Sequence, residues 1–360
     1  MKTSKIKKYL RLFKKRTKRD LPGILILYVT SKCNQKCEHC YYSAELNQPT
    51  DLKLSDYEGI SRELNTIDTL LIGGGEPFTN KELPEILGYF YKYNKTRVFS
   101  IPSNFTLYDR IESSLKKIRE QCPDARVNLN ISFDGLEETH NEIRKFKNAF
   151  ETSMNNCEKI AEQYKNDPKV TMTVASTVMD KNINEIEELG DYVNKRFKGQ
   201  IPIAYGYLRG EPKDPSVKLP AYEELRKLHY NSLKNRKGAG WLTNFVYNSL
   251  IEVKLETLRT QSQVVDCRAG ELMGVIYADG SVSSCELLER IGKINETNSF
   301  SDIWGSKARE NQRKSICNKE CHCTHECFIH PSTVYSRKIL ELPYYFIKHT
   351  IKKVLYNIKS

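Results

Sequence analysis

The sequence predicts an α/β fold, in which a parallel sheet of six β/α units is followed by a small cysteine-rich domain. Between residues 24 and 236, short β-rich runs alternate with amphipathic segments such as Ser55–Leu64 and Ile183–Phe197. This alternation is typical of a parallel sheet with crossover helices, whose ligands bind at the carboxyl ends of the strands. Beyond residue 240 the alternation ends, so a second, smaller unit is expected in a chain of 360 residues.

Six runs predict the strands of the first unit. A later hairpin is predicted because Asp279-Gly280 suits a tight turn between Val275–Tyr277 and Ser281–Ser284. We expect four segments: a basic amphipathic stretch at 1–20, the sheet-forming unit at 21–236, the cysteine-rich unit at 237–335 and a basic amphipathic helix at 336–360. The six predicted strands are Ile24–Thr30, Thr69–Ile72, Arg97–Ser100, Val127–Phe133, Val170–Val178 and Ile201–Tyr207.

The positive charge of the chain, +12 in total, lies in its two ends. Residues 1–20 hold ten Lys or Arg against one Asp, and residues 336–360 hold six against one Glu, which leaves about −2 for everything between them. A nucleic-acid groove would place basic residues in the folded body, so we expect no nucleic-acid partner.

The chain shows no membrane-spanning or secretory segment. No apolar run reaches the roughly 18 residues that span a bilayer, and the N-terminus lacks the apolar stretch of a signal peptide. We therefore expect a cytoplasmic protein. In that reducing compartment, 11 cysteines favour metal sites over disulfides.

Cys33, Cys37 and Cys40 follow the first predicted strand with the spacing CxxxCxxC. A loop can curl three thiolates around one iron–sulfur cluster and leave its fourth iron open to a small chelating molecule. A zinc site or free thiols are the alternatives, although zinc usually has four protein ligands with paired CxxC spacing. One β/α unit later, Gly73-Gly74-Gly75-Glu76-Pro77 closes a strand. Glycines allow the chain to approach a ligand closely, and an acid suits a cationic amine.

Together these motifs resemble the radical S-adenosylmethionine (radical SAM) superfamily over about residues 23–210. The resemblance implies a partial (β/α)6 TIM-like barrel, a 4Fe-4S cluster at Cys33, Cys37 and Cys40, and S-adenosylmethionine chelated by the open iron. Cleavage of the sulfonium by one electron would give a 5′-deoxyadenosyl radical. A donor such as flavodoxin or ferredoxin would supply the electron.

The resemblance also implies cofactor contacts. Backbone of the glycine run and the Glu76 carboxylate would contact the methionine amino group. Tyr42 stands where the family usually has an aromatic residue, with ordinary packing as its alternative. Ser103-Asn104 replaces the family's more usual threonine-asparagine-glycine and would face the ribose.

Further candidates follow the fourth and fifth strands. Ser132-Phe133-Asp134-Gly135 ends the fourth strand, with His140 and Arg144 after it. The resemblance implies that Ser132 and Arg144 contact the ribose and the carboxylate of S-adenosylmethionine. A surface ion pair is the alternative for Arg144. Asn182 is a candidate of the same kind.

A second cysteine group begins with Cys267, Gly280 and Cys285, which are separated by twelve and then four residues. This opening resembles SPASM and Twitch domains, whose hairpin holds an auxiliary 4Fe-4S cluster. Two fully ligated clusters need eight ligands, so either one auxiliary cluster is complete or a second has an open iron or a histidine ligand. A structural zinc site is the alternative. The remaining candidate ligands are Cys317, Cys321, Cys323 and Cys327, with His322, His325 and His330 nearby.

Three residues outside the ligand sets need separate interpretation. Glu286 follows Cys285, where some SPASM enzymes place a carboxylate base that takes a proton from the substrate radical. A solvated acid is the favoured alternative, because charged residues are mostly exposed. Cys122 and Cys157 lie in helical patterns and are expected to be buried packing residues.

The expected activity is radical modification, by an oxidoreductase, of a substrate enclosed between barrel and second domain. A small sugar, an alcohol or a lipid-linked molecule is one substrate class, and a ribosomal peptide is the other. Peptide enzymes often carry a leader-binding domain of about 80 residues, and its expected absence before the first strand weakens the peptide hypothesis. The alternative of a non-catalytic iron–sulfur or zinc protein leaves the glycine-rich motif without a purpose.

Both ends predict basic amphipathic helices. Such helices can lie in a membrane interface, which would make the protein peripheral to the inner face of the membrane. The alternative is that their apolar stripes pack against the barrel while the lysines face water. The stripes are Ile6, Tyr9, Leu10 and Phe13 at one end, and Ile347, Ile351, Val354, Leu355 and Ile358, near Lys348, Lys352 and Lys353, at the other.

Overall fold

The computed structural model describes residues 7, 10, 21–232, 241–295 and 297–359. The described strands form one nine-stranded sheet in the order β6-β5-β4-β3-β2-β1-β7-β8-β9. All neighbours from β6 to β7 pair in parallel, and β8 and β9 are antiparallel additions. The strands are β1 (Ile24–Tyr28), β2 (Thr69–Gly73), β3 (Val98–Ser103), β4 (Arg126–Ser132), β5 (Val170–Val178), β6 (Ile203–Tyr207), β7 (Met273–Ile276), β8 (Ser281–Ser283) and β9 (Gly292–Lys293).

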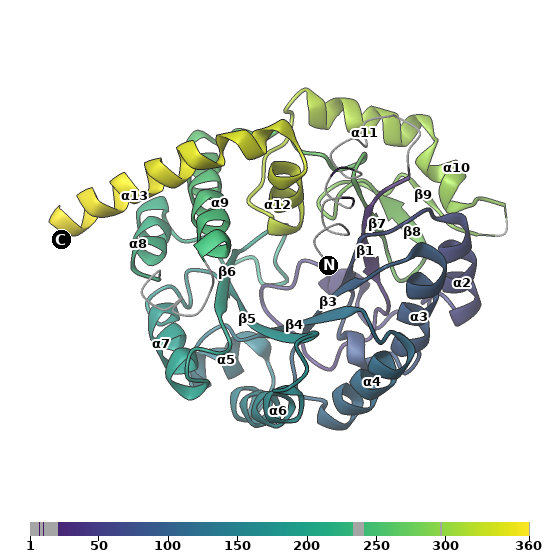
Figure 1. Cartoon of the computed structure of the whole chain (residues 1–360), viewed down its shortest axis with the longest axis horizontal. Coiled ribbons are helices and arrows are strands. Elements are labelled where there is room, and N and C mark those ends of the chain that lie inside the picture. Colours follow the sequence, from purple (N-terminus) through teal and green to yellow (C-terminus); the bar gives the residue numbers. More distant parts are fainter. Residues whose placement is uncertain (1–6, 8–9, 11–20, 233–240, 296, 360) are drawn as a thin grey trace.

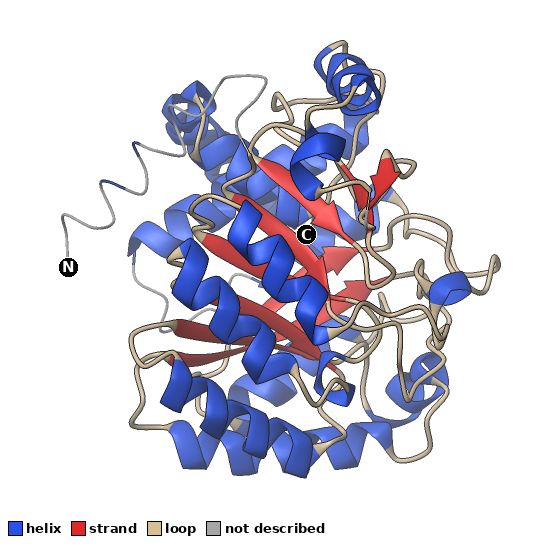
Figure 2. Ribbon diagram, turned by 90° about the vertical axis from the view of Figure 1, so that its right-hand side faces the viewer, coloured by secondary structure: helices blue, strands red, loops and turns tan. Residues whose placement is uncertain are grey.

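Helices follow the strands and cover the outer side of the curved sheet, as an incomplete barrel requires (Figures 1 and 2). The six predicted strands are therefore confirmed, and so is the α/β fold class. The described helices are α2 (Leu54–Glu63), α3 (Leu83–Asn94), α4 (Tyr108–Gln121), α5 (Glu137–Arg144), α6 (Ala149–Tyr164), α7 (Ile186–Arg196), α8 (Tyr222–Ser232), α9 (Trp241–Thr260), α10 (Phe300–Trp304), α11 (Lys307–Cys317), α12 (Glu326–Val334) and α13 (Leu342–Lys359).

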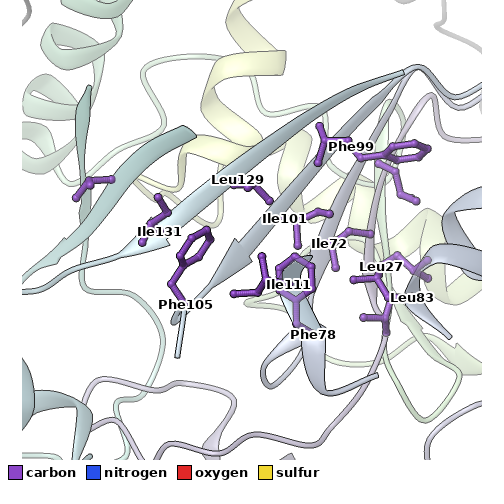
Figure 3. Close-up of a cluster of buried hydrophobic side chains, with 14 of the residues drawn as sticks. Leu27, Ile72, Phe78, Leu83, Phe99, Ile101, Phe105, Ile111, Leu129 and Ile131 are labelled. Carbon is purple, nitrogen blue, oxygen red and sulfur yellow. The ribbon is translucent and has the colours of Figure 1, made fainter. Parts of the chain in front are cut away.

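Strand β1 is buried along its whole length because apolar clusters cover both of its faces. Leu25 and Leu27 point into the large core between sheet and helices, part of which Figure 3 shows. Ile24 and Ile26 point the other way, into a smaller core that includes residues of β7. A continuous apolar strand of this kind is typical of the centre of a parallel sheet.

The predicted hairpin is confirmed as β7 and β8, and β7 pairs with β1 in parallel. Gly280 has φ of +86°, as the tight turn requires. Helix α10 packs closely on this hairpin, since a Cβ on Gly274 would lie 2.6 Å from the Trp304 ring. The cysteine-rich region is thus joined to the barrel through a shared sheet.

Helix α13 runs along α9 at the margin of the molecule (Figure 1). Within the described residues, no helix combines the length and apolar character needed to cross a bilayer. Of the N-terminal stripe, Ile6, Tyr9 and Phe13 lie outside the described residues. The side chain of Ile358 lies outside them as well.

Candidate active site

The loop that carries Cys33, Cys37 and Cys40 leaves the carboxyl end of β1 and rests on the glycine run after β2. The amide of Gly75 donates to the carbonyl of Thr30 at 2.9 Å, and the amide of Glu76 donates to the carbonyl of Lys32 at 2.8 Å. A Cβ on Gly75 would lie 2.2 Å from the Lys32 oxygen. The glycines are therefore needed for close approach between two stretches of backbone, a reason that the sequence argument did not foresee.

Glu76 is buried and links the second strand end to the third. Its Oε1 accepts from the Ser103 hydroxyl at 2.9 Å, and its Oε2 accepts from the Asn104 amide at 2.7 Å. Burial raises the pKa of Glu76 to about 7, against the opposing effect of these hydrogen bonds. The Asn104 side chain in turn donates to Asn34 in the cysteine loop at 2.8 Å. One polar network thus joins the three strand ends.

Arg144 lies under the cysteine loop instead of on the surface, so the surface ion pair expected as its alternative is wrong. Its side chain is 9% exposed, and the guanidinium bonds the fully buried Asp134 carboxylate at 2.6 Å. The same guanidinium lies 3.8 Å from the Cys37 sulfur. Burial outweighs this cation and raises the pKa of Cys37, but the guanidinium favours the thiolate form that a metal requires.

Three other candidates have ordinary structural surroundings. The Asn182 side chain caps local backbone, donating to the carbonyls of Asp134 and Thr177 at 2.8 Å. The Tyr42 ring packs against Tyr28 with 4.7 Å between centroids, which agrees with its packing alternative. Ser132 is half-buried at the last position of β4.

The second cysteine group surrounds a cavity. Four thiols, those of Cys267, Cys285, Cys321 and Cys323, line a space of about 240 Å³ whose other walls are mostly apolar. The four thiols therefore face one common space. Burial raises the pKa of Cys267 to about 12.

The remaining two cysteines of this group lie elsewhere. Cys317 is exposed at the end of α11. Cys327 is close to the charges of Glu286 and Arg209, and neither cysteine lines the cavity. Of the candidate histidine ligands, His322 lines the cavity. Among the described residues, no three His, Cys, Asp or Glu side chains are grouped closely enough to hold a single metal ion.

Glu286 is buried between the two cysteine groups, so the expectation of a solvated acid is wrong. Its side chain is 5% exposed, and Oε1 accepts from the hydroxyls of Tyr28 at 2.6 Å and Tyr41 at 2.7 Å. Burial opposes its ionisation, but the neighbouring His325 and Arg209 and the two hydroxyls outweigh burial and lower its pKa. A buried carboxylate is thereby kept ionised.

Tyr28, Tyr41, Arg209 and Asp134 also belong to this site, although the sequence pattern did not indicate them. Tyr41 directly follows a cysteine, and Asp134 lies inside a motif already selected. Arg209 lies two residues after the end of β6. Other residues of the site also follow the carboxyl ends of their strands. Its place just after a predicted strand could therefore have identified Arg209 as a candidate site residue from the sequence. Cys122 and Cys157, in contrast, are fully buried as expected.

The comparisons with known proteins agree with this geometry. A family model for the radical SAM superfamily matches residues 27–193. Fe-coproporphyrin III synthase of Methanosarcina barkeri is 26% identical over 180 residues, which are 49% of this chain and 42% of that relative. Sporulation killing factor maturation protein SkfB of Bacillus subtilis is 25% identical over 311 residues, 84% of this chain and 69% of SkfB.

A solved structure has the same fold. Native anSMEcpe with bound AdoMet and Cp18Cys peptide superposes with a TM-score of 0.58 at 17% identity, over 93% of this chain and 98% of that one. The chain thus matches less than half the length of the first relative and nearly the whole of this structure. At such identity the structural likeness shows a common architecture.

Proposed function

The chain carries a radical SAM domain and is an enzyme, and from this premise we propose that it abstracts a hydrogen atom from a peptide substrate. The domain implies a 4Fe-4S cluster and S-adenosylmethionine as cofactors. The observation that carries the proposal is the convergence of the cysteine loop, the glycine run and Arg144 at one edge of the sheet.

We assign the ligands of the first cluster to Cys33, Cys37 and Cys40. Three thiols on one short loop are a donor set that suits an iron–sulfur cluster with one open iron. When bound, this cluster and S-adenosylmethionine supply a 5′-deoxyadenosyl radical at the expense of one electron. Because the reaction consumes an electron, we expect a donor such as flavodoxin or ferredoxin.

The roles of the surrounding residues follow from their contacts. Glu76 holds Ser103 and Asn104 in place beside the cysteine loop. Because both of its oxygens already accept hydrogen bonds, its effect on the cofactor would pass through these neighbours as well as through direct contact. Arg144 stabilises the thiolate of Cys37.

We propose that Cys267, Cys285, Cys321 and Cys323 hold one complete auxiliary cluster. Four thiols around a cavity of about 240 Å³ support a bulky occupant, for which a single ion would be too small. This assignment favours one complete auxiliary cluster over two partial ones. Cys327 is then left outside the ligand set.

Glu286 is our candidate for the base. It is ionised, excluded from water and placed between the two cysteine groups, adjacent to Cys285 and hydrogen-bonded to the residue after Cys40. Its carboxylate would accept the proton that the substrate radical releases, and the auxiliary cluster, when bound, would take up the electron that the substrate gives up with it. The hydroxyls of Tyr28 and Tyr41 orient the Oε1 of this carboxylate.

The peptide substrate is supported by the names of similar proteins. SkfB is a maturation protein for a killing factor, and the anSMEcpe structure has AdoMet and the Cp18Cys peptide bound. A structural match over 93% of this chain extends the likeness beyond the radical SAM domain. If no peptide is modified in the experiment below, a small-molecule or lipid-linked substrate would be favoured instead.

The test uses anaerobically reconstituted protein with S-adenosylmethionine and a reductant. We expect 5′-deoxyadenosine, and we expect a candidate peptide to lose hydrogen by mass spectrometry. Replacing Cys33, Cys37 and Cys40 together with Ala should abolish cleavage and remove about four irons per chain. The double Cys122→Ala, Cys157→Ala variant is the control and should keep its iron. No 5′-deoxyadenosine from the wild type, or an unchanged iron count in the triple variant, would contradict the assignment.

A further inference from the structure

The outer face of α13 is apolar and is left exposed by the described part of the chain. Six large apolar side chains are between 53% and 79% exposed, and the first five follow one another at intervals of three or four residues, with the sixth next to the fifth. The first lies in the preceding 3-10 turn (Arg337–Glu341), and the others lie on one face of the helix. They are Leu340, Tyr344, Ile347, Ile351, Val354 and Leu355.

The opposite face of α13 is already filled by the protein. Leu342, Tyr345 and His349 are buried on it, and the Ser249 hydroxyl of α9 donates to the carbonyl of Leu342 at 3.0 Å. The Phe346 ring lies 5.0 Å from the Phe245 ring. Contacts on this side anchor the helix without using the apolar stripe.

Two lysines of α13, Lys348 and Lys352, are turned toward α9. Lys348 bonds Glu256 at 3.0 Å, and Lys352 bonds Glu252. The expected alternative, in which the stripe packs on the barrel while the lysines face water, is therefore wrong for this helix. The arrangement is the reverse, and exposed apolar area of this extent marks a contact surface.

The net charge of the chain ends indicates which kind of partner can bind to this apolar face. Residues 336–360 carry six Lys or Arg against one Glu, and residues 1–20 carry ten against one Asp. A second copy of the chain, or its own N-terminal segment, would bring further positive charge to a positive helix and be repelled. An anionic lipid surface offers both the opposite charge and an apolar layer.

We propose that α13 is a membrane-contact helix that lies in the interface of an anionic bilayer. Its apolar face enters the boundary between headgroups and acyl chains, while the basic residues of the C-terminal segment other than Lys348 and Lys352 lie at headgroup level. The acids of α9 hold the helix to the body of the enzyme and so hold the enzyme at the membrane.

The experiment is co-sedimentation of the full chain with vesicles at low salt. Vesicles of phosphatidylcholine with about 30% phosphatidylglycerol should bind the protein, and pure phosphatidylcholine vesicles should bind it much less. The double variant Ile347→Ser, Ile351→Ser should weaken binding at least about tenfold, because it removes two inserted side chains. Leu219→Ser is the matched control, since Leu219 is also exposed but lies between β6 and α8, and it should bind as the wild type does.

Three results would overturn the proposal. One is a full chain that stays in the supernatant with anionic vesicles, and another is a double variant that binds as tightly as the wild type. The third is a dimer in the absence of vesicles that the double variant dissociates, which would make a second copy the occupant. Cleavage of S-adenosylmethionine should be equal in all variants, so a fault in the radical chemistry is detected separately.

Discussion

At the residue scale, Glu286 shows how distant parts of the chain create one chemical group. Its carboxylate is separated by 258 positions from Tyr28 and by 245 from Tyr41, yet both hydroxyls donate to the same oxygen. His325 lies 3.1 Å from the other oxygen. A buried acid with several partners is costly to form and is characteristic of functional sites.

Replacing Glu286 with Gln tests its role as a base. The substitution preserves shape and removes the acceptor for a proton, so the rate of substrate product formation should fall by about 10²- to 10⁴-fold. Cleavage of S-adenosylmethionine and iron content should persist, because neither depends on this proton transfer. Product and 5′-deoxyadenosine are measured in the same reaction.

Tyr41→Phe is the companion variant, because it removes one hydrogen bond to the same oxygen and leaves the carboxylate in place. It should lower the product rate less than Glu286→Gln does. If both variants formed product at the wild-type rate, Glu286 would have a structural role only.

At the element scale, the position of the cysteine loop depends on the glycine run after β2. Gly74 has φ of +119°, and a Cβ there would lie 2.3 Å from the Thr30 carbonyl oxygen. The neighbouring Gly75 meets the Lys32 oxygen just as closely. The loop and the glycine run therefore form one unit, although they belong to different β/α units.

Gly75→Ala should displace the cysteine loop and lower the iron content of the first site, because backbone atoms cannot yield as a flexible side chain would. Gly59→Ala is the control, since a Cβ there meets nothing within 4 Å and helix α2 should gain up to about 1 kcal/mol. Iron analysis of both variants measures the occupancy of the first site, and thermal unfolding measures their stability. Full iron occupancy in Gly75→Ala would show that the loop tolerates the added methyl group.

Glu256 of α9 pairs with Arg259 of the same helix and with Lys348 of α13, so the stability of this pair of helices should depend on pH. Hydrogen bonds from Arg259 and Lys348 lower the pKa of Glu256 to about 2, against an ordinary value of 4.5. Because the folded-state pKa is depressed, its stabilisation is complete above pH 4.5 and is lost as the pH falls toward 2. Glu256→Gln should therefore lower the free energy of unfolding by up to about 3 kcal/mol at pH 7, and the difference should shrink in acid.

Denaturant unfolding at several pH values measures this difference. Glu162→Gln removes the same charge at an exposed pair with Lys165, and it should change the free energy of unfolding by less than about 1 kcal/mol. A difference between wild type and Glu256→Gln that stays constant from pH 7 to acid would contradict the shifted pKa.

At the scale of the whole molecule, the central strand β1 is shared by both cysteine-rich regions. One face belongs to the barrel core, and the other faces the core that contains Cys285. The cysteine loop leaves the end of this strand, and the hairpin that leads to Cys285 pairs along its side. The two sites are therefore held in a fixed relation by one sheet.

Iron content tests the number of clusters. About eight irons per chain are expected, four for each 4Fe-4S cluster. Cys323→Ala should remove about four of them, whereas Cys317→Ala should remove none, because Cys317 is exposed and does not line the cavity. If the wild-type chain contained four irons and one zinc, the auxiliary site would be a structural zinc site and the assignment of a second cluster would be wrong.

The sequence by itself determined the parts of this protein that depend on local pattern. Alternating apolar runs identified the six parallel strands, and β5 was predicted with its observed bounds. The first cysteine group and the glycine run lie within about 40 residues of each other and at consecutive strand ends, so the geometry of a β/α unit was enough to bring them together.

Only the tertiary structure decided the relations between distant segments. It brought Glu286 to Tyr28 and Tyr41, selected four of six cysteines around one cavity and turned two lysines of α13 toward α9. Spacing along the chain carries no information on these contacts, since they depend on how β7 pairs with β1 and how α13 packs on α9. Helical periodicity fixes which residues share a face, and long-range packing decides which face is buried.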